Sequence, residues 1–523
     1  MKEVYKLRLI TDTIGTVIKM AILHDEYNKI TAKLEKQLFE NISTLEALFK
    51  DCADVVKRKL TIGGVNKIDI YFIYIDNMVN KDLLEEDTLH YLIHKMDDLP
   101  NENQFEYIKN KGLRSADIAE VITMDEAVQF ILGGDTIILV DGFDKAIKIS
   151  VRGMPNRGVP TSENEVAIRG SKESFSEAFY INRILLRRRI KDTNLKMKQV
   201  KVGTRTLTDV AIVFIEDVAK PEVVADIEKR ISEFIIDGIF DCGMLEQLTE
   251  RNWYSPFPEF QATERPDKAA SAILEGRVVL LVDNSPMALI LPSTLNSFFQ
   301  ASDDAYKRWE VATFIRIVRY IGALLTIALP GLYIAVVNYQ AELLSSAMAL
   351  SFAASRGGVP FSVLFEVILM EIAFELLLEA GIRLPGPMGS TLGIVGGLVI
   401  GDAAVSANLV SPMVVIVIAL TAICAFTVPN EEFASAFRVI RYLLIILSAF
   451  LGLYGFILGC MILLIHLAGL KSFGVPYLLP FAASGMKASS DGKDALVKYP
   501  IKDLNQRPTF SKEEERTRLV RKK

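Results

Sequence analysis

The residues with the clearest capacity for chemistry are four glutamates within one apolar segment, 361–380. They are Glu366, Glu371, Glu375 and Glu379. On a helix, Glu375 lies about 40° and Glu379 about 80° around the axis from Glu371, so these three share a face. An ionised side chain at the centre of a bilayer costs about 2.5–3.5 kcal/mol on insertion scales. The shared face must therefore meet water, cations or protein.

Three roles for this acidic face are open. The carboxylates line an ion pathway or its vestibule, or they anchor neighbouring helices through ion pairs, with Arg356 or Arg383 as partners. A location close to the membrane surface would also make the cost small. Only the first role makes Glu371, Glu375 and Glu379 part of a pore.

A second acidic position, Asp402, ends the glycine-rich segment 393–401. A helix of small residues with one carboxylate at its end predicts a pore-lining helix. In that hypothesis Val395 and Val399 form an apolar constriction that gates by dewetting. The alternative is a tightly packed buried helix, because glycines let helix backbones approach closely.

A basic run, Arg187, Arg188 and Arg189, lies in the predicted helix 182–190. One interpretation is a solvated helix face. The other is a surface that contacts anionic headgroups or a partner subunit.

No motif of a known enzyme class accompanies these residues. The 523-residue sequence has no Walker-type glycine loop with a lysine, no HExxH and no GxSxG. Its four cysteines are far apart and form no zinc-ligand pattern. The net charge of −5 provides no bulk basic field for nucleic acid. We therefore expect a non-enzymatic protein without a cofactor or metal.

The elements that position these residues divide into a charged and an apolar part. Hydrophobic residues make up 50% of the chain and charged residues 24%, which is typical of a soluble region joined to membrane helices. A membrane helix needs about 20 apolar residues. We expect five spans within the apolar segments 320–341, 361–380, 384–401, 403–430 and 442–470.

The orientation follows from the basic residues at the ends of these segments. Arginines precede the first and last spans, and the tail is basic, so the positive-inside rule places both ends of the membrane domain in the cytoplasm. Lys19 interrupts the first apolar run, so we expect no secretory signal and a cytoplasmic soluble region. An even number of crossings requires either that 343–355 also crosses or that 442–470 folds back near Gly452.

The soluble region contains an internal repeat. Two apolar β-branched runs, 68–76 and 131–141, recur as 208–217 and 273–283, with Val140 matching Val282 and Ile75 matching Glu216. Each copy predicts strand, helix, helix, strand. The fold class is therefore an α/β soluble N-terminal region of two similar subdomains, followed by an α-helical multi-span membrane domain. The expected boundaries are 1–33 for an extension, 34–150 and 165–305 for the subdomains, 151–164 for a linker, 306–481 for the membrane domain and 482–523 for a charged tail.

Several motifs together resemble the A subunit of spore germinant receptors, the GerA family of endospore-forming bacteria. They are Thr263–Lys268, Leu274–Arg277, Ala380–Pro385, Gly393–Gly401 and Ser472–Tyr477. The resemblance covers about residues 34–481. Asp402 departs from it, since the family pattern places a glutamine there.

The resemblance implies a nutrient sensor in the spore inner membrane, with the soluble region in the spore core. Copies of the A subunit would form an oligomeric, gated channel for monovalent cations within the membrane lipids. A permease-like B subunit and a lipoprotein C subunit would be its partners. A non-conducting scaffold that assembles the receptor and relays the signal is the alternative.

Overall fold

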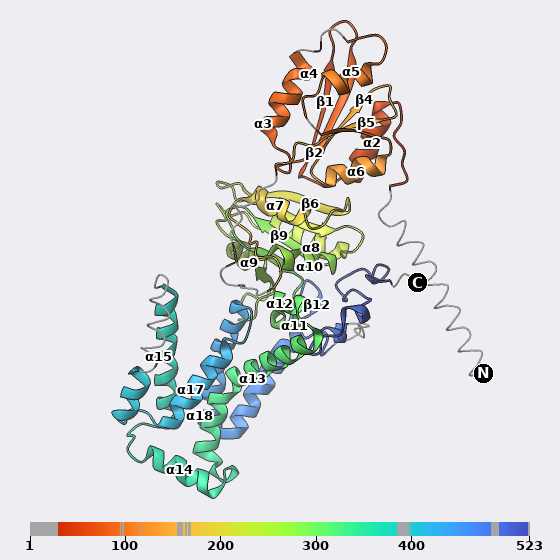
Figure 1. Ribbon diagram of the computed structural model, residues 1–523. Coiled ribbons are helices and arrows are strands. Elements are labelled where there is room, and N and C mark those ends of the chain that lie inside the picture. The colour runs from red at the N-terminus through yellow and green to blue at the C-terminus, as the bar shows by residue number, and fades with distance from the viewer. Residues whose placement is uncertain are drawn as a thin grey trace, which may run out of the picture. The chain divides into compact units, whose positions relative to one another are not determined.

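The computed structural model describes residues 30–94, 96, 99–115, 117–153, 161–162, 165, 169–383, 397, 399–482 and 491–520. These residues form two compact units (Figure 1). The first contains the described residues up to Glu250, Phe260–Pro292 and the residues from Pro500 onward, and the second contains Arg251–Glu259 and Ser293–Tyr499. The first unit is α/β and the second is helical.

The first subdomain is a five-stranded antiparallel sheet in the order β1-β2-β4-β5-β3. Its strands are β1 Val55–Ile62, β2 Ile68–Ile75, β3 Ile118–Val121, β4 Thr136–Val140 and β5 Ala146–Ile149. Its α-helices are α2 Leu38–Leu48, α3 Lys81–Leu84, α4 His90–His94, α5 Gln104–Lys111 and α6 Met124–Leu132.

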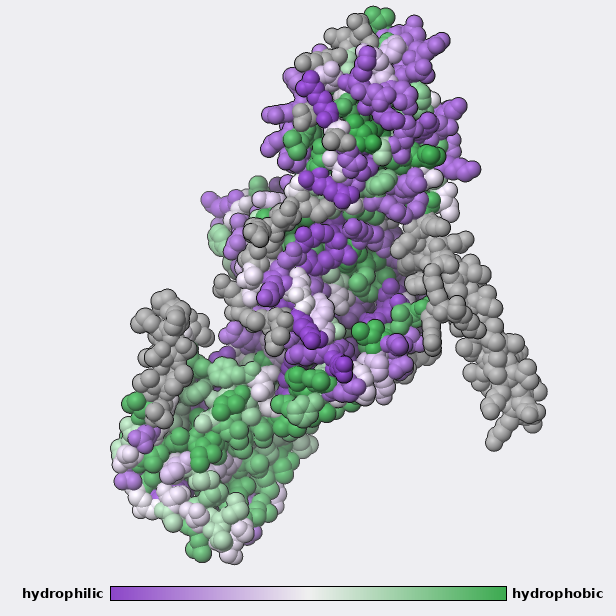
Figure 2. Space-filling model, viewed as in Figure 1, coloured by the Kyte–Doolittle hydropathy of each residue, from purple (hydrophilic) through white to green (hydrophobic). Residues whose placement is uncertain are grey.

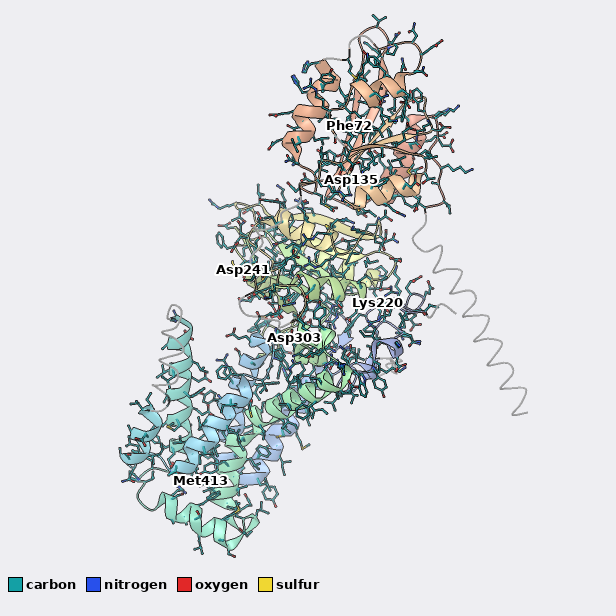
Figure 3. All side chains as sticks on the ribbon, in the orientation of Figure 1. Phe72, Asp135, Lys220, Asp241, Asp303 and Met413 are labelled. Atoms are coloured by element: carbon teal, nitrogen blue, oxygen red, sulfur yellow. The ribbon has the colours of Figure 1, made fainter. Side chains whose placement is uncertain are left out.

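Helices cover both faces of this sheet because β2 is apolar on both sides. Successive side chains of a strand point to opposite faces. Tyr71, Ile73 and Ile75 pack in a core with residues of α2 and α6. Ile70 and Phe72 (labelled in Figure 3) pack in a second core with residues of α3, α4 and α5.

The second subdomain repeats this architecture with the strand order β6-β7-β9-β10-β8. Its strands are β6 Leu195–Val202, β7 Thr208–Ile215, β8 Gln261–Thr263, β9 Val278–Val282 and β10 Ala288–Leu291. Its helices are α7 Phe179–Arg187, α8 Pro221–Ser232, α9 Cys242–Thr249 and α10 Pro266–Leu274.

The strand registers confirm the repeat and adjust its alignment. Ile70 pairs with Val140 in the first sheet, and Val210 pairs with Val282 in the second. The last residues of β2 and β7, Ile75 and Ile215, occupy equivalent places opposite β1 and β6. Ile75 therefore corresponds to Ile215 rather than to Glu216, and the segment that connects β7 to β9 is two residues longer than the one that connects β2 to β4.

The helical unit begins with two short helices and continues with long apolar ones. Its α-helices are α11 Leu295–Phe299, α12 Ser302–Tyr306, α13 Trp309–Tyr339, α14 Ser346–Arg356, α15 Val363–Arg383, α17 Pro412–Ala425 and α18 Glu431–Gly469. A further helical stretch occupies 399–406. Two very short strands, β11 Lys471–Ser472 and β12 Val475–Pro476, follow α18.

Helix α18 reverses direction in its middle. Gly452 has φ 61° and ψ −139°, which is not helical. A Cβ placed on Gly459 would lie 2.4 Å from Leu444, although these residues would be about 22 Å apart along a straight helix. The Tyr339 hydroxyl at the end of α13 donates to the Ala449 carbonyl beside this turn, at 2.6 Å. The segment therefore forms a helical hairpin, which is the fold-back expected near Gly452.

Helix α14 covers most of the segment 343–355, for which an additional membrane crossing, a re-entrant segment and an interfacial segment were the alternatives. It has 11 residues and none of them is buried. Its length is about 16 Å, which is half of a ~30 Å hydrocarbon core. As a helix, α14 is therefore too short to cross a membrane.

The surface of the helical unit is mainly apolar, whereas the two subdomains carry mostly hydrophilic residues (Figure 2). Among the described residues, α13 and α18 are long and apolar enough to cross a membrane, and α17 is a shorter apolar helix. The number of crossings remains a prediction.

The end of the chain packs on the second subdomain. Ser511 pairs with Ala219 as an isolated β-bridge, and the Lys512 amide donates to the Val218 carbonyl at 2.9 Å. The guanidinium of Arg277 lies 4.2 Å from the ring centre of Phe510. The expected charged tail is thus in part an ordered strap of the first unit.

We predict that Gly452→Ala weakens the hairpin of α18. The new Cβ would lie 2.9 Å from Tyr339 Cγ, in a backbone conformation that side chains rarely adopt. The expected loss is about 1–3 kcal/mol. It is measured as a lower thermal midpoint of the purified protein in detergent. Gly469→Ala is the control, because a Cβ there meets no atom of the described chain within 4 Å; an equal shift in both variants would contradict the prediction.

Candidate functional site

The four glutamates of α15 lie in different surroundings. Glu366 is fully buried, and Arg356 of α14 donates to its Oε1 at 3.3 Å. Its Oε2 accepts the backbone N–H of Ser411 at 2.8 Å. Ser411 is the N-cap of α17, so the carboxylate also meets the positive end of that helix. Glu366 therefore connects α14, α15 and α17.

Glu371 forms a buried ion pair with α18. Its Oε2 lies 2.7 Å from Nη2 of Arg441, and the side chains of Glu371 and Arg441 are 1% and 3% exposed. The same Nη2 lies 3.1 Å from Glu375 Oε1, and Arg438 Nη1 lies 3.4 Å from Glu375 Oε2. We call these four residues the acid–arginine cluster.

The acid–arginine cluster borders a cavity of about 310 Å³ between α15, α17 and α18. Two of its buried atoms, Glu371 Oε1 and Arg441 Nε, have no hydrogen-bond partner among the described residues. Apolar residues form most of the remaining wall, among them Phe374, Leu378, Ile418, Ala422 and Phe426. A cavity with charged residues in its wall can hold water or a small polar group.

The other predicted pore residues that the structure describes are exposed. Within the described part of the chain, Glu379 pairs with Arg383 of its own helix, at 2.6 Å, and both side chains are largely solvent-accessible. Val399 and Asp402 are exposed, and no hydrogen bond or ion pair joins Asp402 to another described residue. Val395 lies outside the described residues. The structure brings Glu371 and Glu375 together, and it does not bring either into contact with Asp402.

Sequence reasoning proposed Arg356 and Arg383 as partners, and both do bind glutamates of α15. Arg438 and Arg441 were not predicted as partners of the glutamates; in the sequence they had indicated only the orientation of the last span. A signal was available: two arginines three residues apart lie on one face at the start of an apolar run, and such charges require partners within the membrane.

The basic run of α7 is used within the chain. Arg187 has no exposed surface, and its Nε and Nη2 donate to Asp54 at 2.7 and 2.9 Å. Burial alone would lower the pKa of Arg187, but the negative charge of Asp54 outweighs this effect and raises the pKa. The expectation that Arg187 contacts a membrane or a partner does not fit this position, because the pair joins the second subdomain to the first.

Arg188 and Arg189 share one carboxylate. Both donate to Glu173, and each remains partly exposed. Burial alone would raise the pKa of Glu173, but the two guanidinium groups hold the pKa of that carboxyl below its usual value. These two arginines can therefore contact an outside partner only if they leave or share Glu173.

These features define a class of protein, an apolar helical unit held by buried ion pairs and attached to a duplicated α/β region. Residues 43–510 match the family model for the Bacillus/Clostridium GerA spore germination protein. The chain belongs to this family. The match continues past residue 481, where the sequence resemblance was expected to stop, into the strap that packs on the second subdomain.

Two relatives match this chain over most of their own length. Spore germination protein A1 of Bacillus subtilis is 36% identical over 90% of this chain and 95% of its own. The uncharacterized membrane protein YfkQ of the same organism is 36% identical over 92% of both chains. The N-terminal domain of the A subunit of the Bacillus megaterium spore germinant receptor GerK3 matches 51% of this chain and 99% of its own, with 25% identity and a TM-score of 0.38.

We predict that Glu371→Gln destabilises the helical unit far more than Glu379→Gln. Removing one partner of a buried pair costs up to about 3–5 kcal/mol, and in this variant Arg441 keeps Glu375, whose side chain is partly exposed, as a carboxylate neighbour. The exposed Glu379–Arg383 pair contributes about 0–1 kcal/mol. Thermal unfolding in detergent compares the two variants, and the double variant Glu371→Leu/Arg441→Met should recover much of the loss. Equal shifts in the two single variants would show that the pair is not the stabilising contact.

We also predict a pH dependence of the contact between Glu173 and the two arginines. Because the pKa of Glu173 is lowered in the folded chain, its contribution is complete above the ordinary glutamate pKa of about 4.3. It is lost as the pH falls through the lowered value. The protection of α7 amides from hydrogen exchange, relative to their intrinsic rates at each pH, should therefore fall in acid, and Glu173→Gln should show the lower protection already at neutral pH. A pH profile that is the same in both proteins would contradict this.

Proposed function

We propose that this chain is the A subunit of a nutrient germinant receptor and that copies of it form a gated cation channel in the spore inner membrane. Family membership supports the role in germination, since several relatives carry the name spore germination protein. The partners in this proposal are a permease-like B subunit, a lipoprotein C subunit and further copies of the chain. The soluble region lies in the spore core, and the membrane domain crosses several times.

The observation that carries the channel is the exposure of carboxylates on an apolar unit. Glu379 and Asp402 are exposed on helices whose other accessible residues are mostly apolar, such as Leu376 and Ile400. Facing lipid near the bilayer centre, each would cost about 2.5–3.5 kcal/mol. Neighbouring copies that enclose a water-filled path remove this cost, and a ring of carboxylates favours cations. Val399, one turn before Asp402, is the apolar constriction in this arrangement.

A second function is favoured by the acid–arginine cluster. Glu371 and Glu375 are neutralised by Arg441 and Arg438, so in this conformation they stabilise helix packing rather than attract free cations. A non-conducting scaffold that assembles the receptor and relays the germinant signal uses them in this way. In the channel, the same pairs serve as the frame that holds α15 beside the path.

Ion flux from liposomes that contain the assembled receptor tests the proposal. We expect germinant-dependent release of monovalent cations, which Asp402→Asn reduces several-fold while assembly is unchanged. Val399→Ala should leak without germinant, because a smaller side chain widens the constriction. Leu376→Ala, on an exposed apolar position of α15, is the control for general disturbance of the unit. An assembled receptor that never conducts would overturn the channel and leave the scaffold.

A further inference from the structure

The segment Arg251–Glu259 belongs to the helical unit, although it lies between elements of the second subdomain in sequence. Asn252 donates its backbone N–H and its side-chain amide to Glu259 at 3.1 and 2.7 Å, which closes the segment into a loop. Ser472 Oγ donates to the Glu259 carbonyl at 2.8 Å, and the Tyr477 hydroxyl donates to the Pro258 carbonyl at 3.1 Å. The loop is therefore fastened to the chain that follows α18.

The loop is also fastened to the end of α18 itself. Ser255 Oγ and His466 Nε2 form a hydrogen bond of 2.8 Å, one turn before α18 ends at Gly469. Phe257 is buried, and its ring centre lies 5.8 to 6.1 Å from those of Phe433, Phe437 and His466. These residues come from both ends of the α18 hairpin, so the loop sits at its base.

Two large aromatic side chains in this loop are left uncovered by the described part of the chain. Trp253 is 80% exposed and Tyr254 is 68% exposed, while their rings meet edge to face at 6.1 Å. They lie two and one residues before Ser255, so their Cα atoms are within about 8 Å of the Ser255 Cα. Aromatic side chains usually stabilise a protein through the large apolar area that they bury, and rings left in water do not make this contribution.

The adjacent surface indicates what covers them. The second half of α18 exposes an apolar band that ends at Leu464 and Ile465, immediately before His466. Lys471 is exposed and lies two residues after the end of α18, so it places a positive charge close to His466 in sequence. A membrane helix that passes from the core of the bilayer to its surface shows a fixed order of residue types. Apolar residues face the hydrocarbon, Trp and Tyr follow at the interface, and basic residues come last.

We propose that Trp253 and Tyr254 form an interfacial anchor that inserts into the lipid headgroup layer at the base of the α18 hairpin. The rings contact the first carbons of the acyl chains, while the indole N–H and the phenol hydroxyl stay with headgroups and water. The anchor holds the chain between α9 and β8 at the membrane surface. It rests on the placement of α18 in the membrane that is part of the proposed function.

The chain contains only two tryptophans, Trp253 and Trp309, so Trp309→Phe makes Trp253 the sole indole. The full-length variant is reconstituted into phosphatidylcholine–phosphatidylglycerol vesicles that contain lipids brominated either near the headgroup or near the acyl-chain end. We expect the shallow bromines to quench about a third or more of the emission and the deep bromines clearly less, since an interfacial ring lies near the headgroups.

Two reference variants, made in the background Trp253→Phe/Trp309→Phe, calibrate the depth. Met461→Trp places an indole on the exposed apolar band of α18, where deep bromines should quench it, and Tyr180→Trp places one on α7 of the soluble region, where neither lipid should. Retained thermal transitions show that each variant is folded.

The outcomes separate the anchor from the proposed function. Quenching of Trp253 by shallow bromines supports the anchor. If Met461→Trp is quenched but Trp253 is not, the anchor is overturned and the membrane placement stands. A second measurement uses acrylamide, a quencher dissolved in the water. If Trp253 is protected from acrylamide and is not quenched by the brominated lipids, protein covers it, which also overturns the anchor. If neither indole is quenched, both the anchor and the membrane placement fail.

Discussion

A carboxylate that is buried among apolar helices must find a cation or water, and in the helical unit this requirement determines how α15 is held. Glu366 meets Arg356 and the start of α17, and Glu371 meets Arg441 of α18. α15 therefore cannot shift relative to α17 or α18 without separating a buried charge from its partner. A rearrangement of α15 has to exchange one partner for another, which makes discrete alternative arrangements more accessible than gradual movement.

The path of the chain provides a route by which the two units can influence each other. The chain passes repeatedly between them, at residues 250–251, 259–260, 292–293 and 499–500. The crossings at 250–251 and 259–260 flank the loop at the base of α18. The crossing at 499–500 leads into the strap, which packs on the loop after β7 and on α10. The loop at the base of α18 and the strap are therefore each joined covalently to the other unit.

The duplicated α/β region uses the same means of attachment. The buried Asp54–Arg187 pair crosses from one subdomain to the other, so the two copies form one unit although each has its own sheet and core. A buried pair of this kind contributes little net stability compared with apolar packing, but it penalises every arrangement in which the two charges do not meet. It therefore specifies how the copies dock.

The α/β repeat, the positions of most apolar helices, the acidic row and the family could be predicted from the sequence alone, because strand alternation, helix length and motif spacing are local properties of the chain. It predicted α15 and its shared acidic face, and it included the fold-back at Gly452 as one of two possibilities. Three features become visible only in the folded chain. Arg438 and Arg441 bind this face, Arg187 is buried, and residues 251–259 and 500–520 return to units distant in sequence. Ion-pair partners and docking segments depend on which distant elements pack together, and that choice is a property of the whole fold rather than of any local pattern.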